Sequence, residues 1–205
     1  MLGFIKENSY SVFKMIINQI AMAIFGLALT FATSNFDVIF LIVSIFAALF
    51  YMVLLYTMTW DVGFEQSRSI EAGRRKYIKL SGVYMSLLAN ALNIILGIMI
   101  VVGYYSSTEF ILRDAAGEIT SDTALAVSFA PSAPEWAANV YGIGKIAATF
   151  LSGMYNGIIA SLPKLNPWIY LMIIVPSVVV CGIAYPMGVR GKHFTKFLGK
   201  KPSLE

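Results

Sequence analysis

The sequence carries little charge for its length. Of its 205 residues, 13% are charged and 58% are apolar, whereas a soluble domain is about 25% charged and about 45–50% apolar. A single core cannot bury such an excess of apolar residues, so lipid must face much of the surface. We therefore predict one membrane domain, residues 1–205, without an appended soluble catalytic domain.

Cysteine and histidine, which often bind metals or take part in catalysis, are also scarce. Cys181 is the only cysteine and His193 the only histidine, which excludes an intrachain disulfide and a cysteine-based zinc or iron–sulfur site. Because the one histidine lies in a basic tail, no Ser–His pair is available for nucleophilic catalysis. We expect no metal site, no cofactor and no enzymatic activity.

Four apolar stretches are long enough to cross a bilayer, whose hydrocarbon core takes roughly 20 residues to span. They are about 12–32, 38–59, 81–104 and 168–189. The first is longer than the apolar region of a cleavable signal peptide, about 7–15 residues, so we interpret it as a retained span. None of the four contains Asp, Glu or His, the side chains that hold protons in coupled transporters. We predict an all-α integral membrane protein with a four-helix transmembrane bundle.

A fifth stretch, 140–161, is ambiguous. Wound as a helix it is amphipathic, with Lys145 on its polar side, which suits an interfacial or re-entrant helix. Its Gly153 and Gly157 form a GxxxG spacing that equally suits a packed fifth span. Both interpretations stay open, although a fifth span would move the basic C-terminal tail to the outer side.

The basic residues indicate the orientation. With both termini cytoplasmic and four spans, the cytoplasmic side holds 12 of the 15 lysine and arginine residues, mostly in a loop at 60–80 and a tail at 190–205. The external segment, 105–167, keeps the other three. The positive-inside rule favours this arrangement. The net charge of +4 thus indicates orientation rather than nucleic-acid binding, and we expect a multi-pass protein of the cell (plasma) membrane.

The external segment contains one pattern typical of a turn. Phe110–Arg113, a turn at Asp114–Gly117 and Glu118–Thr120 can form a short β-hairpin. Pro131 and Pro134 then mark an irregular connection.

Four basic residues cluster in the cytoplasmic loop, namely Arg74, Arg75, Lys76 and Lys79. Such a cluster beside a span can bind anionic lipid headgroups, or it can serve only to set the topology. Glu71 and Arg75 are spaced i,i+4, which predicts that the preceding helix continues through this cluster.

Small and amide residues align on the third span. Wound at 100° per residue, they fall within about 80° of one another; they are Gly82, Ser86, Asn90, Asn93 and Gly97. The fourth span has a comparable face of Ser177, Cys181, Ala184 and Gly188. Such faces form a seam between helices, or they line a path for a polar solute.

These observations lead to two hypotheses for the function. The first is a non-enzymatic subunit, assembly factor or regulator of a membrane complex, acting as a homo- or hetero-oligomer with other membrane proteins. The alternative is a permeation protein for a small solute or ion that uses the polar face of the third span. The lipid bilayer is the expected environment in both, and nucleic acid is not an expected partner.

Overall fold

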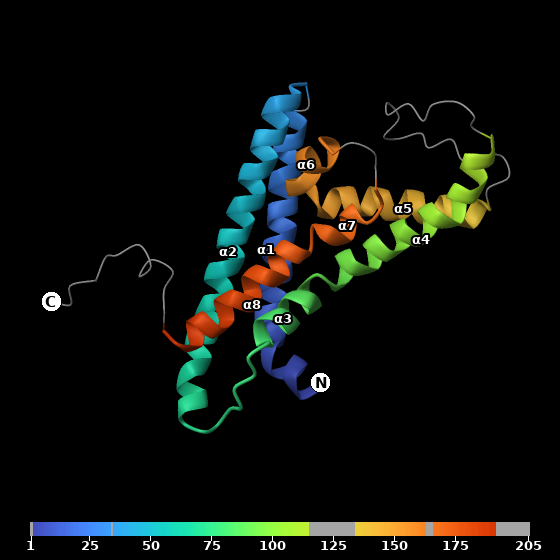
Figure 1. Ribbon diagram of the computed structural model, residues 1–205. Coiled ribbons are helices and arrows are strands. Elements are labelled where there is room, and N and C mark those ends of the chain that lie inside the picture. The colour runs from blue at the N-terminus through green and yellow to red at the C-terminus, as the bar shows by residue number, and fades with distance from the viewer. Residues whose placement is uncertain (1, 34, 115–133, 163–165, 192–205) are drawn as a thin grey trace. The chain divides into compact units, whose positions relative to one another are not determined.

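The computed structural model describes residues 2–33, 35–114, 134–162 and 166–191 (Figure 1). Every regular element in these ranges is a helix, so the all-α prediction is confirmed for the described part of the chain. The chain divides into two compact units. Unit 1 comprises Met1–Gln19, Leu49–Asn90 and Val175–Glu205, and unit 2 comprises Ile20–Ala48 and Ala91–Ile174.

Three helical segments are long and apolar enough to cross a membrane. They are Glu7–Thr33 within α1 (Leu2–Thr33), Val38–Glu71 within α2 (Asp37–Glu71), and Ile169–Val189, which joins α7 (Ile169–Met172) to α8 (Val175–Val189). A fourth is added if the bent pair Ser81–Ala89 and Ala91–Ser106 is one span. These helices indicate a membrane protein.

The outer faces of α1 and α2 are apolar. Only 28% of the most apolar window of α1 and 22% of that of α2 is buried. Large exposed side chains recur every three or four residues; they are Phe13, Ile17, Ile20 and Ile24 on α1, and Ile39, Ile42, Phe46, Leu49 and Val53 on α2. In water such stripes would be unfavourable, but in lipid they are the expected surface.

Helix α2 extends well beyond the predicted span of 38–59. It continues through residues expected in the loop 60–80 and ends at Glu71. Gly73 then adopts φ +70°, with its N–H donating to the carbonyl of Ile70 at 3.0 Å, which is a common glycine-based helix stop. The expected helical pairing of Glu71 with Arg75 is therefore wrong, because the chain has left the helix before Arg75.

The predicted third span, 81–104, is broken at Asn90. Helix α3 (Ser81–Ala89) ends there and α4 (Ala91–Asp114) follows, so the stretch is a broken helix rather than one straight helix. The Asn90 side chain donates to the carbonyl of Ser86 at 2.9 Å. Asparagine competes in this way with the regular helical ladder, and the single stripe predicted from one straight helix is divided between two helices.

A proline explains the break in the predicted span 168–189. Helix α7 ends at Met172 and α8 begins at Val175, with Pro176 in its first turn. The proline ring cannot accommodate the carbonyl four residues earlier in a continuous helix, but it is tolerated in a first turn.

The stretch 140–161 belongs to three successive elements rather than one helix. They are α5 (Glu135–Leu151), the 3-10 turn η1 (Gly153–Tyr155) and α6 (Asn156–Ala160). Ser44 of α2 bonds both sides of this interruption: its Oγ donates to the Met154 carbonyl at 2.7 Å and accepts from the Ile158 N–H at 3.3 Å. Side-chain hydroxyls often satisfy a broken helix in this way.

The first predicted strand of the β-hairpin, Phe110–Arg113, is instead part of helix α4. The hairpin's remaining residues, 115–120, lie outside the described residues, as does the tail from residue 192.

Candidate functional site

The small residues of α3 and α8 meet in unit 1. Gly82 lies so close to α8 that a Cβ there would collide with the carbonyl oxygen of Cys181. Asn90 donates through Nδ2 to the Ser177 hydroxyl at 3.3 Å. Ser86, Cys181 and Ala184 are fully or almost fully buried. The structure thus brings together Gly82 and Asn90 of the third predicted span with Cys181 and Ser177 of the fourth.

Helix α8 packs equally closely against α2. A Cβ at Gly188 would collide with the Trp60 carbonyl, and one at Gly63 with the Tyr185 carbonyl. The Thr59 hydroxyl donates to the Cys181 Sγ at 3.3 Å. Because these small residues contact other helices of the same unit, their surfaces are already covered by contacts within the chain.

The other two members of the predicted stripe lie in unit 2. Gly97 packs against Leu171 of α7, and Asn93 is half-buried on α4. The break at Asn90 separates them from Gly82 and Ser86, so the five residues do not form one continuous face.

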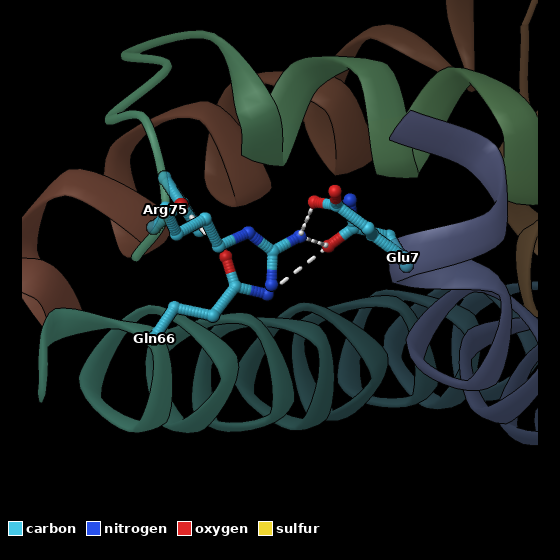
Figure 2. A network of polar contacts seen from close by, with 5 residues as sticks. Glu7, Gln66 and Arg75 are labelled. Atoms are coloured by element: carbon cyan, nitrogen blue, oxygen red, sulfur yellow. Dashed lines mark hydrogen bonds and ion pairs between the residues drawn. The ribbon is translucent and has the colours of Figure 1, made fainter. Parts of the chain in front are cut away.

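A polar network with a buried centre at Asn8 joins four segments of unit 1 (Figure 2). Arg75 Nη2 lies 3.0 Å from Glu7 Oε2 and donates to Asn8 Oδ1 at 3.1 Å. Gln66 Nε2 donates to the same Asn8 oxygen at 3.0 Å, and Gln66 Oε1 accepts from the Tyr185 hydroxyl at 2.8 Å. Asn8 is 0% exposed. The network therefore ties α1, α2, α8 and the loop after α2 to one another.

A small cavity of about 120 Å³ lies beside this network. Its lining comprises Glu7, Arg75, Lys76, Ile78, Ser81 and Tyr185. The predicted basic cluster divides here, because Arg75 is partly buried in the network while Arg74, Lys76 and Lys79 are exposed. Of the four, only Arg75 and Lys76 line the cavity.

In unit 2, α5 packs against α4 around Lys145. The core there comprises Leu96, Ile100, Tyr141, Ala148 and Tyr170. Lys145 Nζ lies 5.6 Å from the centre of the Tyr141 ring. It is buried, and among the described residues it has no hydrogen-bond partner. Buried ammonium groups are normally paired, so this one is an exception.

Burial shifts the titration of this cluster. Desolvation lowers the pKa of Lys145 below its usual 10.5. Desolvation first, and then the neighbouring Tyr170 and Tyr104, raise the pKa of Tyr141 to about 12. Lys145 is thus less readily charged than an exposed lysine, while Tyr141 stays protonated at all physiological pH values.

One side of α5 next to Lys145 is open. A Cβ added at Gly142, three residues earlier, would meet nothing within 4 Å. Ala138, four residues before Gly142, is small and half-buried. The apolar side chains of Trp136, Ile143, Ile146 and Phe150 are exposed on the neighbouring face.

The sequence singles out Arg75 and Lys145 but not the contacts that each of them makes. Asn8 and Gln66 were not selected because their partners are far away in the chain, and only the fold brings them together. Lys145 had a local signal, since it is the one charged residue in an otherwise uncharged stretch, and charges in such stretches are often functional.

The described residues contain no group of three or more His, Cys, Asp or Glu arranged to hold a metal ion. No family model, curated protein or solved structure matches the chain.

Proposed function

We propose that the protein is a non-enzymatic subunit or assembly factor of a membrane complex, and that it contacts its partner through α5 at Lys145. The observation that carries this proposal is the buried Lys145 ammonium without a hydrogen-bond partner among the described residues. A cation in a medium of low polarity is costly unless it is paired. A carboxylate on a partner helix supplies the missing partner.

The surroundings of Lys145 suit the approach of another helix. Ala138 and Gly142 are spaced i,i+4, a small-residue spacing that permits close backbone contact, and the space at Gly142 is open. The lysine stem has four methylene groups, which allow the ammonium to turn from the Tyr141 ring toward this side. By contrast, Gly82, Asn90 and Cys181 are occupied by contacts inside unit 1, so their face is a seam of the chain itself.

Co-purification in mild detergent tests the proposal. Lys145→Met removes the charge, and Gly142→Leu adds bulk on the side where a Cβ would meet nothing within 4 Å. Both are expected to lose the partner at least tenfold, whereas Lys145→Arg retains it. Lys14→Met is the matched control, because Lys14 is an exposed lysine on α1. A partner without a carboxylate at its contact with α5, or one retained equally by Lys145→Met and Lys14→Met, would refute the contact.

The second candidate function is permeation of a small solute or ion. The breaks at Asn90 and before Pro176 favour it, since transporters often place discontinuous helices at their binding sites. Against it, the Asn90 amide already donates to Ser86 and Ser177. Flux of small solutes through liposomes containing the purified protein alone would support permeation, and an association subunit is inert in this assay.

The orientation proposed for the protein places both termini in the cytoplasm of a cell whose plasma membrane it spans. Single cysteines at Thr120 and Ser203, in a Cys181→Ser background, report the two sides. An impermeant thiol reagent added to intact cells is expected to label the first and not the second. The opposite pattern would reverse the orientation, and labelling at both positions would indicate a fifth span.

A further inference from the structure

The cavity of unit 1 has room and charge for a phosphate group. Its volume of about 120 Å³ is several times the roughly 10–15 Å³ that a cavity needs to hold one water molecule on the same measure. Three side chains that are charged at neutral pH line it, Glu7, Arg75 and Lys76. Glu7 and Arg75 form an ion pair at 3.0 Å, so the lining carries one uncompensated positive charge, that of Lys76.

Hydrogen-bond donors also surround the cavity. Arg75 uses one terminal nitrogen for Glu7 and Asn8, and a guanidinium has five N–H donors in total. Ser81 is the first residue of α3, a nine-residue helix whose N-terminus has no side-chain cap. The Ser81 N–H already donates to the Ile78 carbonyl at 3.0 Å, but the positive end of the helix dipole still favours an anion. Arg75, Lys76 and the start of α3 therefore form a lining suited to an anion.

Apolar residues beside the cavity indicate that the phosphate group belongs to a lipid rather than to free phosphate. Ile78 is part of the lining, and it is 39% exposed, with Tyr77 at 38% and Leu80 at 51%. Tyrosine and aliphatic side chains interleaved with basic residues are typical of a membrane interface. A phospholipid brings its apolar acyl chains to such a surface, whereas free phosphate does not.

We infer that this cavity binds the phosphodiester of an anionic membrane phospholipid, held by Lys76 and Arg75 at the start of α3. A phosphodiester has a single negative charge, which matches the single uncompensated charge of the lining. The inference is independent of Lys145, which lies in the other unit. It also distinguishes the members of the basic cluster, since Arg74 and Lys79 lie outside the lining.

Lipid retention by the purified full-length protein tests the inference. Phosphatidylglycerol and phosphatidylcholine with identical acyl chains are offered in equal amounts, and bound lipid is counted by native mass spectrometry. Lys76→Gln is expected to lower retained phosphatidylglycerol about fivefold, the effect of one basic residue near a charged membrane surface. Lys79→Gln removes the same charge from the same loop and is expected to change retention less than twofold.

Three outcomes would overturn the inference. Equal losses in Lys76→Gln and Lys79→Gln would indicate only a diffuse basic surface. Equal retention of the two lipids by the unmodified protein would exclude selection by charge. Displacement of phosphatidylglycerol by an equal concentration of inorganic phosphate would assign the cavity to free phosphate instead. Because Lys76 is exposed, its substitution leaves the Arg75 network in place, and an unchanged melting temperature checks that the variant is folded.

Discussion

Asn8 at the centre of the polar cluster in unit 1 and the ammonium nitrogen of Lys145 in unit 2 are both buried, but they differ in how far their hydrogen-bonding groups are satisfied. In unit 1, Asn8 accepts from both Gln66 and Arg75, and Gln66 accepts in turn from Tyr185. In unit 2, the ammonium of Lys145 faces the Tyr141 ring and has no hydrogen-bond partner among the described residues. A satisfied network stabilises the fold, whereas an unsatisfied cation lowers stability and is a candidate for function.

The largest effect is expected from Asn8→Ala. This change deprives the Arg75 guanidinium and the Gln66 amide of a common acceptor in a fully buried position. The Gln66 amide then loses its bond to Asn8 and Arg75 keeps only its ion pair with Glu7, which costs about 3 kcal/mol because one of the two lost bonds has a charged donor. The free energy of unfolding, measured in detergent, reports the loss. A decrease of less than about 0.5 kcal/mol would show that the network does not hold unit 1 together.

A slightly smaller loss is expected from Gly82→Ala in the seam of unit 1. The added methyl group would collide with the Cys181 carbonyl and the Tyr185 Cβ, and overpacking of this kind costs about 1–3 kcal/mol. Gly142→Ala is the control, because the same methyl group meets nothing within 4 Å on α5. If both variants melt alike, the close contact of α3 with α8 is incorrect.

Comparing these positions shows what the sequence could predict. The apolar stretches locate the helices because about 20 apolar residues suffice to cross a bilayer. The breaks could not be predicted from hydropathy, since Asn90 interrupts its helix through a bond to Ser86, and residues 140–161 are interrupted where Ser44, more than 100 positions away, supplies the bonds. The pairing of Arg75 with Glu7 depends equally on tertiary contacts, whereas its neighbour Glu71 suggested a local pair.

Lys145→Met tests the unsatisfied cation of unit 2. Because it removes an unpaired cation, we expect stability to be unchanged or higher, in contrast to Asn8→Ala. The difference in stability between the unmodified protein and Lys145→Met is also expected to depend on pH. The folded-state pKa of Lys145 lies below its unfolded value of 10.5, so between these values the unfolded chain binds more protons and the native protein gains stability as the pH rises.

Thermal melting between pH 7 and pH 10 measures this dependence. Tyr141 does not interfere in that range, because burial and its neighbours raise its pKa to about 12. The stability of the unmodified protein relative to Lys145→Met is expected to increase with pH. A flat difference, or one that falls, would mean that Lys145 has a compensating partner, and the proposed role of its ammonium would then lose its basis.

The smallest effect is expected at the bond between Asn90 and Ser177, which lies where the predicted stripe is divided. Hydrogen bonds inside membranes average about 0.6 kcal/mol, so a double-mutant cycle with Asn90→Leu and Ser177→Ala should give a coupling of about that size. Asn90→Leu alone should cost more than Ser177→Ala, because it also removes the bond to the Ser86 carbonyl. If the coupling were zero and a cysteine at position 90 reacted with small water-soluble thiol reagents, the amide would face water. The seam of unit 1 would then be a polar path, and permeation would become the better account of this face.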